Sequence, residues 1–345
     1  MMSRQDQHAG PAAEAYQAGH DLIIHRSMSA EQIGEVITGV ARHLQVYVAE
    51  AEDRANSRLE EFKAVVVERF TKLDEVEAKP EAFRDPDFQF ALSQAQQAFV
   101  RRGDQELRDE LVALLVKRSA EEPTSRRALV LNDAIATAGK LTREDRAALV
   151  TVFVLRHMSL NAPIRGPAMS ALNGHLSLFL DDLPASVACV EYLIMLRCVF
   201  ARQFGEDLAN TLHSNYHDLC NAGFSGDAFR EAIGNEDARK LSGILAPGPV
   251  AHSTFRFFMP PKADLHQELL ARNLSEDAAG KLFALHQAGE PKPGEVELIM
   301  LREISALGRI SEIWTSSGLS GMMLTPLGKA IAFSILVGVP VSTRR

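Results

Sequence analysis

The sequence predicts an all-α protein that combines a long N-terminal helix, a multi-helix bundle and a small winged-helix-like C-terminal unit. Three observations lead to this fold class. Apolar residues recur at steps of three and four over residues 33–76, which is the period of one face of an α-helix. Amphipathic segments punctuated by glycine and proline follow over residues 87–158, and β-prone runs are few and short.

Composition sets the broad class of the protein. A chain of 345 residues is long for one core, and its 46% hydrophobic and 24% charged residues are ordinary for a globular protein. The formal net charge of −8 argues against a nucleic-acid partner, which usually requires a basic face. Three cysteines without a C-x-x-C pair predict buried thiols in a reducing compartment.

Neither end of the chain predicts membrane insertion. Residues 1–16 lack the apolar segment of a signal peptide, so we expect a cytoplasmic protein. The apolar run at 330–341 is shorter than the roughly 20 residues that a bilayer span requires. It therefore predicts a buried core helix, with a C-terminal anchor as the alternative, and we expect no membrane association.

Residues 1–28 predict a disordered tail followed by a short β segment. Leu22, Ile23 and Ile24 form the β-prone run. A lone strand leaves its backbone hydrogen-bonding groups unpaired, so it requires a partner edge. We therefore expect these three residues to assist self-association.

Residues 29–80 predict one long helix. Ser29 and Gln32 match a capping box, and Pro80 ends the segment. About 50 residues of helix would extend for roughly 75 Å at 1.5 Å per residue. Within this segment only Glu50–Arg58 has a weak apolar face.

A helix of this length must bury its apolar stripe against a hairpin partner or another chain. The helices that follow are each less than about half as long, because glycine and proline interrupt them. Pairing with a second copy therefore solves the burial problem most directly. The sequence predicts a homo-oligomer with Ile37 and Leu44 in the interface; the competing possibility is a bend near Glu50–Arg58 that folds the helix back.

The middle of the chain predicts two helical blocks, at 81–160 and 161–245. In the first block we expect helices at about 87–100, 104–119, 125–138 and from 142 onward. In the second block, Val187–Phe204 is apolar on nearly every side, which predicts a central buried helix.

Residues 246–345 predict the winged-helix-like unit. Thr254–Met259 is a strand candidate, and helices are expected near 262–272 and 275–288. The strand-like Met322–Leu324 and the following Thr-Pro-Leu-Gly resemble the wing strand and closing helix of winged-helix modules. Arg309 and Lys329 are the candidate DNA contacts, but the basic surplus is too thin to favour DNA binding.

Motifs for catalysis or cofactors are sparse. The sequence contains no P-loop, dinucleotide fingerprint, H-E-x-x-H or G-x-S-x-G pattern, so we expect no cofactor, and an enzyme is the less favoured interpretation. His213, His217 and Cys220 share one helical face at spacings that could hold zinc. A fourth ligand is missing nearby, and the alternative is that they are half-buried helix residues.

Several blocks of sequence resemble a known family. They are Tyr16-Gln-Ala-Gly-His-Asp-Leu-Ile-Ile, Phe83-Arg-Asp-Pro-Asp-Phe-Gln-Phe-Ala-Leu, Arg102-Gly-Asp, Leu129-Val-Leu-Asn-Asp-Ala-Ile and Leu324-Thr-Pro-Leu-Gly-Lys-Ala-Ile-Ala. Together they resemble an uncharacterised bacterial family catalogued only under a pair of locus tags, and the resemblance covers most of the chain. It implies an all-helical fold and brings no catalytic motif.

The leading Q-A-G-x-D motif, with His20 at the variable position, also resembles a short tag on bacterial conflict and phage-defence proteins. That resemblance implies a protein partner in a defence system. The sequence thus leaves three functional hypotheses. The first is a non-enzymatic, self-associating helical protein of a bacterial defence or mobile-element system. The second is a winged-helix DNA-binding regulator, and the third is a metal-dependent enzyme at His213, His217 and Cys220.

Overall fold

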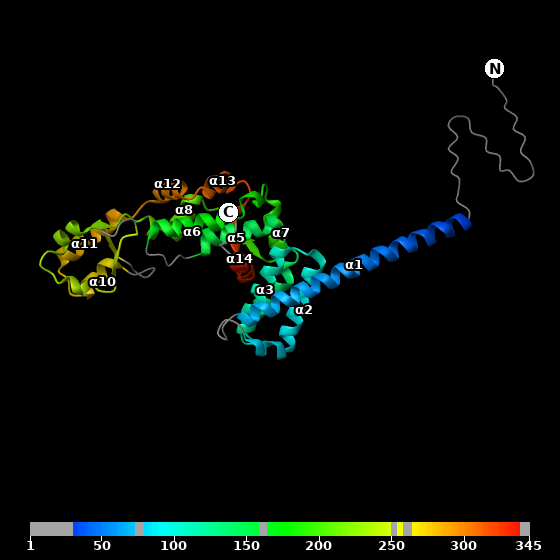
Figure 1. The fold of residues 1–345 in the computed structure, drawn as a ribbon. Coiled ribbons are helices and arrows are strands. Elements are labelled where there is room, and N and C mark those ends of the chain that lie inside the picture. Colours follow the sequence, from blue (N-terminus) through cyan, green and yellow to red (C-terminus); the bar gives the residue numbers. More distant parts are fainter. Residues whose placement is uncertain (1–29, 73–78, 159–163, 250–253, 258–263, 339–345) are drawn as a thin grey trace, which may run out of the picture. The chain divides into compact units, whose positions relative to one another are not determined.

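The computed structural model of the chain describes residues 30–72, 79–158, 164–249, 254–257 and 264–338. Its α-helices (Figure 1) are α1 (Ala30–Lys72), α2 (Pro86–Arg102), α3 (Gln105–Ala120), α4 (Arg126–Ala138), α5 (Arg143–His157), α6 (Arg165–Ser177), α7 (Ala188–Met195), α8 (Leu208–Cys220), α9 (Gly226–Ile233), α10 (Leu265–Ala271), α11 (Glu276–Gly289), α12 (Pro293–Glu303), α13 (Ala306–Ile313) and α14 (Pro326–Gly338). The 3-10 helices are η1 (Pro80–Arg84), η2 (Leu180–Asp182), η3 (Ala238–Leu241) and η4 (Leu319–Gly321). The strands are β1 (Val199–Ala201), β2 (Phe224–Ser225), β3 (Leu245–Pro247), β4 (Thr254–Phe257) and β5 (Met322–Leu324). The expected all-α fold with a long N-terminal helix is confirmed.

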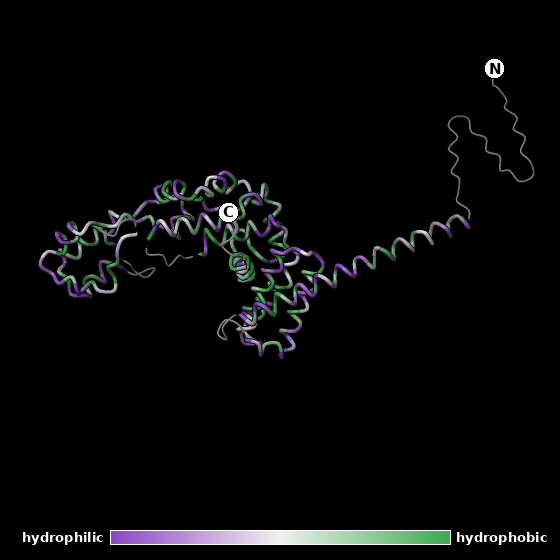
Figure 2. Tube along the Cα trace, viewed as in Figure 1, coloured by the Kyte–Doolittle hydropathy of each residue, from purple (hydrophilic) through white to green (hydrophobic). Residues whose placement is uncertain are grey.

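The described residues divide into two units inside α1, residues 30–56 and the described part of 57–338. In the first unit, α1 presents an apolar stripe to solvent. Val40 is 52% exposed, Leu44 54% and Tyr47 61%. Figure 2 shows hydrophobic residues recurring among hydrophilic ones along this part of the helix.

In the second unit, the remainder of α1 belongs to the hydrophobic core. Phe62, Val66 and Phe70 are buried, and the Phe62 ring lies 5.7 Å from the ring of Phe99 in α2. The expectation that the whole stripe requires a second chain is therefore wrong for this part. Short helices of the same chain cover it, because three large side chains need only a few turns of partner helix.

Helices α2 to α5 begin at capping side chains that the sequence contains at those positions. Asp85, Asp104, Ser125 and Thr142 each accept a hydrogen bond from a backbone N–H in the first turn of the helix that follows. Gly103 ends α2 in the left-handed conformation. The helices predicted for this region agree with the observed bounds to within about two residues, as is usual for helix termini.

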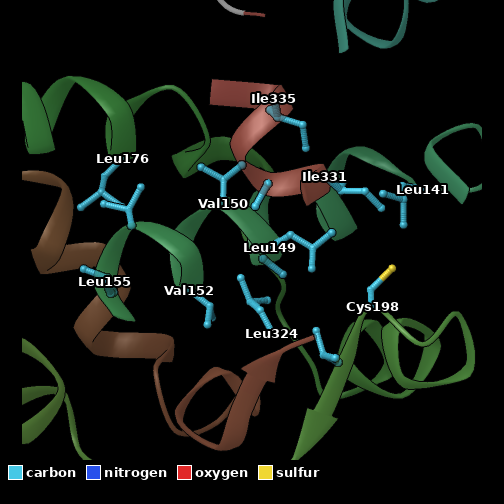
Figure 3. Close-up of a cluster of buried hydrophobic side chains, with 14 of the residues drawn as sticks. Leu141, Leu149, Val150, Val152, Leu155, Leu176, Cys198, Leu324, Ile331 and Ile335 are labelled. Atoms are coloured by element: carbon cyan, nitrogen blue, oxygen red, sulfur yellow. The ribbon is translucent and has the colours of Figure 1, made fainter. Parts of the chain in front are cut away.

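Helix α14 lies beside α3, α4 and α5 and completes the large core (Figure 1). Ile331 and Ile335 of α14 belong to the same buried cluster as Leu149 and Val150 of α5 (Figure 3). All four side chains are buried. The apolar run near the C-terminus thus forms a core helix. None of the helices in the described part of the chain combines the length and apolar character needed to cross a bilayer.

The predicted buried helix at Val187–Phe204 is confirmed only over its first half, as α7, in which Cys189, Val190 and Leu193 are buried; its second half is wrong. Helix α7 ends at Met195, Arg197 adopts a positive φ of 60°, and the chain continues as β1. A left-handed residue cannot continue an α-helix. The segment is apolar on every side, but not all of its side chains are buried: Met195 and Phe204 are largely solvent-accessible.

A smaller hydrophobic core lies around a three-stranded sheet with the order β2-β4-β3. Strand β4, which the sequence predicts as part of Thr254–Met259, is antiparallel to both neighbours. Helices α9, α10 and α11 pack around this sheet through buried residues that include Phe229, Leu269 and Leu282.

The second sheet pairs β1 with β5, and Val199 lies opposite Leu324 in an antiparallel register. The strand expected to serve as a wing thus pairs with a strand more than 120 residues earlier in the chain. Residues of the C-terminal hundred contribute to both hydrophobic cores.

Candidate functional site

The Asp85-Pro86-Asp87 motif forms an ionic network around a buried arginine. Arg118 of α3, whose side chain is 1% exposed, donates to Asp87 at 2.6 Å and to Asp85 at 3.3 Å. Asn132 of α4 accepts from Arg118 at 2.9 Å and donates to Asp87 at 2.8 Å. These hydrogen bonds lower the pKa of Asp87. The motif therefore joins α2, α3 and α4.

The Arg102-Gly-Asp motif has a similar structural role. The Arg102 guanidinium donates to the carbonyl oxygen of Leu141 at 2.5 Å, and Asp104 caps α3. Nearby, Arg146 pairs with the buried Glu110 at 2.9 Å. Burial raises the pKa of Glu110 to about 7 although Arg146 opposes the shift.

The Leu-Thr-Pro-Leu-Gly motif fastens α14 to the turn after α7. The Thr325 hydroxyl lies 3.0 Å from the Cys198 carbonyl oxygen and accepts from the Gly328 N–H at 3.2 Å. A side chain at Gly328 would place its Cβ 2.1 Å from that same carbonyl oxygen. The glycine is required because the two backbones approach so closely.

The predicted zinc ligands do not form a ligand set. His213 Nε2 lies 3.1 Å from the Pro291 carbonyl oxygen, and His217 Nδ1 lies 3.0 Å from the His213 carbonyl oxygen. Cys220 is buried, and burial raises its thiol pKa to about 11. Within the described ranges, no group of three or more histidine, cysteine or acidic side chains is placed to hold a metal ion.

The other predicted site residues fall into two groups. Arg309 pairs with Glu312 at 2.8 Å on the surface of α13, and Lys329 is exposed on α14. Leu44 is exposed on α1, whereas Leu22, Ile23, Ile24 and the side chain of Ile37 lie outside the described residues.

The main candidate site is a groove of about 830 Å³. Its walls come from α3, α4 and α14 together with Arg69 of α1, and we call it the α3–α4–α14 groove. Nine of its fourteen lining residues are apolar, including Val116, Leu131, Phe333 and Val337.

Lys117 is the distinctive residue of this groove. Its Nζ lies 3.1 Å from the centre of the Phe333 ring, which is a cation–π contact between α3 and α14. Burial lowers the Lys117 pKa to about 8. Among the described residues no carboxylate pairs with it, unlike the neighbouring Arg118.

A second, smaller pocket of about 200 Å³ is polar. Arg156 Nε, His157 Nε2 and Thr211 Oγ1 are buried there without a hydrogen-bond partner among the described residues. Burial and the neighbouring cations lower the His157 pKa to about 4, so this imidazole is neutral at physiological pH. Polar partners and this volume suit ordered water.

Sequence reasoning missed the α3–α4–α14 groove. Arg126 and Arg127 have acidic residues nearby in the sequence, and Arg127 lies 3.6 Å from Glu121. The available signal was Lys117 on the apolar face that continues from Ala113, but the sequence does not reveal which helix would lie over it. Phe333 is more than 200 residues away.

The comparisons with known proteins place the chain in a family. A family model described only as ":-like" matches residues 27–340. The chain belongs to this family. Its description names no activity, ligand or partner, and no curated protein and no solved structure matches the chain. The match includes the Asp-Pro-Asp, Arg-Gly-Asp and Thr-Pro-Leu-Gly blocks, whereas the Q-A-G-x-D segment precedes it.

Proposed function

We propose that this protein is a non-enzymatic, self-associating helical protein in which the first part of α1 contacts a second copy. The observation that supports this is the exposed apolar stripe of Val40, Leu44 and Tyr47. These residues are spaced by four and three positions, which is the heptad spacing of helices that pair side by side.

A second copy is the occupant that best fits this stripe. A heptad face is complementary to another helix with the same spacing, because each side chain fits between four residues of its partner. Burying one large apolar side chain contributes about 1.5–3 kcal/mol. A stripe of this kind left in water is an aggregation liability, so self-association is also the outcome that keeps the protein monodisperse.

A non-enzymatic role is consistent with the chemistry of the described residues. The thiols of Cys198 and Cys220 are buried, and burial raises their pKa values to about 12 and about 11. A thiol that stays protonated is a poor nucleophile. The conspicuous ionic groups, such as Arg118 and Arg146, hold helices together.

Membership of a bacterial defence or mobile-element system is the finer part of the proposal. It rests on the resemblance of the Q-A-G-x-D segment to defence tags and on analogy between proteins. Deleting residues 1–28 should abolish protection in a bacterial host challenged with phage. Unchanged plaque counts with and without the gene would refute a defence role.

Light scattering coupled to size-exclusion chromatography tests self-association. The double variant Val40→Asp, Leu44→Asp should run as a monomer at micromolar concentrations where the unchanged protein is an oligomer. Gln45→Asp, Ala49→Asp is the matched control, since it adds the same charge on another face of the same helix. A monomeric unchanged protein, or equal dissociation by both variants, would overturn the proposal.

A further inference from the structure

The walls of the α3–α4–α14 groove suit an apolar chain. Val116 of α3, Leu131 of α4 and Val337 of α14 line it, and Phe333 and Val337 remain close to half exposed. Ligand pockets are typically about 300–1,000 Å³ and mostly apolar with a few placed polar groups. The groove, at about 830 Å³, falls within that range.

The charges around the groove are one-sided. Arg69, Lys117, Arg126 and Arg127 line it as cations, and Glu121 is the one acid in its lining, which leaves a net charge of +3. Glu121 lies 3.6 Å from Arg127, so its charge is already engaged. A protein whose formal net charge is −8 thus presents a positive patch at an apolar groove.

Two features indicate where an anionic group would lie. Lys117 is withdrawn from water over the Phe333 ring and has no carboxylate partner among the described residues. Arg126 and Arg127 occupy the first turn of α4, at the positive end of the helix dipole, where cations are unfavourable and anions are stabilised. An anion bound between α3 and the start of α4 would offset both unfavourable placements.

We propose that the α3–α4–α14 groove binds a long-chain carboxylate, with the carboxylate at Lys117 and Arg126 and the alkyl chain along Phe333 and Val337. The apolar walls exclude a purely polar anion as the best ligand, because it would leave the exposed phenylalanine and valine uncovered. The net positive charge repels a cationic amphiphile and gives a neutral one of the same length no charge attraction.

Calorimetric titration of the full chain with dodecanoate, below its micelle concentration, tests this proposal. We expect saturable binding of one dodecanoate per chain, with dodecanol and butyrate each binding much more weakly. Lys117→Met keeps the length of the side chain and removes its charge. It should weaken dodecanoate binding roughly ten- to hundredfold, as expected for loss of a charge-assisted contact.

Two pairs of variants locate the site. Lys140→Met removes an exposed lysine away from the groove and should leave binding unchanged. Val337→Trp fills the groove from its exposed side and should abolish binding, whereas Leu129→Trp, an exposed position of α4 outside the lining, should not. Retained helical circular dichroism and a cooperative unfolding transition show that each variant is folded.

Four results of the binding experiments, and one of the oligomer mass, would overturn the proposal. The four are no binding of dodecanoate, equal binding of dodecanol, equal effects of the groove variants and their controls, and binding that occurs only after residues 339–345 are removed. The last result would assign the groove to the chain's own C-terminal segment. A fall in oligomer mass caused by Val337→Trp would assign it to a second copy, and would overturn the ligand site separately from the α1 interface.

Discussion

The two parts of α1 differ in what covers them although they belong to one helix with one apolar period. Over residues 30–56 the stripe of Val40, Leu44 and Tyr47 is exposed to solvent. Over residues 57–72 the continuation of the stripe through Phe62 and Phe70 is buried in the core of the second unit. The spacing of apolar residues predicts that one face of the helix is apolar, but it does not predict which segment covers that face.

What separates the two parts is the set of aromatic partners available to each. Phe70 lies 5.0 Å from the ring of Phe83 and 6.4 Å from that of Phe88, both edge-on, and Phe62 contacts Phe99. Edge-to-face pairs of this kind add about 0.5–1.5 kcal/mol to the gain from burial. The first part of α1 has no such partners within the described residues.

Phe62→Ala should produce the largest effect on stability. Removing a fully buried phenylalanine costs about 3–5 kcal/mol, because it loses both transfer free energy and packing around the cavity. Leu44→Ala, on the exposed part of the same helix, should change the free energy of unfolding by less than about 0.5 kcal/mol. Urea unfolding at concentrations where the chain is monomeric measures both. Equal losses would show that both stripes are covered within one chain.

Arg118→Ala should follow closely in magnitude. It removes the charge-assisted hydrogen bonds from Arg118 to Asp87 and Asn132. Because the Asp87 carboxylate left behind is 45% exposed and can be hydrated, the loss should be about 1.5–3 kcal/mol. Arg127→Ala is the control, because its 3.6 Å pair with Glu121 is exposed on the arginine side and such pairs contribute about 0–1 kcal/mol. Comparable losses in the two variants would contradict the structural role assigned to the Asp-Pro-Asp motif.

The sequence predicts the fold where the signals are local. Capping residues and glycines defined α2 to α5 closely, because Asp85, Ser125 and Gly103 act on the nearest turn. The helix prediction failed in the second half of 187–204. There Arg197 adopts a left-handed conformation, which a sequence normally signals by a glycine. Composition in that segment indicated burial, but tertiary packing left Met195 and Phe204 exposed.

The candidate groove was not predictable for a different reason. Lys117 and Phe333 meet only because α14 packs on α3, and no spacing rule connects residues so far apart in sequence. The zinc hypothesis at His213 and His217 used a valid helical spacing. That spacing contains no information on Pro291, whose carbonyl oxygen lies within hydrogen-bond distance of His213 in the fold.

The most local comparison of the two parts of α1 uses Arg58→Ala and Arg54→Ala. The two arginines are one helical turn apart and lie on either side of the division between residues 56 and 57. Arg58 donates to the carbonyl oxygen of Val100 at 2.7 Å, near the C-terminus of α2. Its loss should cost about 1.5 kcal/mol, as for a hydrogen bond from a charged group. Among the described residues Arg54 pairs with the exposed Glu50 at 3.5 Å and with no other acid, so its loss should cost less than about 0.5 kcal/mol. Thermal unfolding of both variants decides the matter, and a larger loss in Arg54→Ala would place the division elsewhere.

The smallest effect is expected at Lys117, which is partly buried and has no carboxylate partner among the described residues. Here the substitution should increase the free energy of unfolding. Burial lowers the pKa of Lys117 to about 8, below its usual 10.5, so the charged form is disfavoured in the folded state. Because the unfolded chain then binds more protons between pH 8 and 10.5, the stability of the unchanged protein should rise with pH across that window. Lys117→Met should stabilise the ligand-free protein at pH 7 by about 1 kcal/mol, a value reduced for solvent screening.

The advantage of Lys117→Met should therefore shrink as the pH approaches 10, because the lysine of the unchanged protein loses its charge. Urea unfolding at pH 7, 8.5 and 10 measures this trend, and Lys140→Met should show no such pH dependence. Destabilisation by Lys117→Met at every pH would mean that the contact with Phe333 outweighs the loss of hydration. Lys117 would then be a structural contact like Arg58. Stabilisation at pH 7 combined with weaker dodecanoate binding would instead distinguish it as a group whose burial is favourable only when an anion is bound.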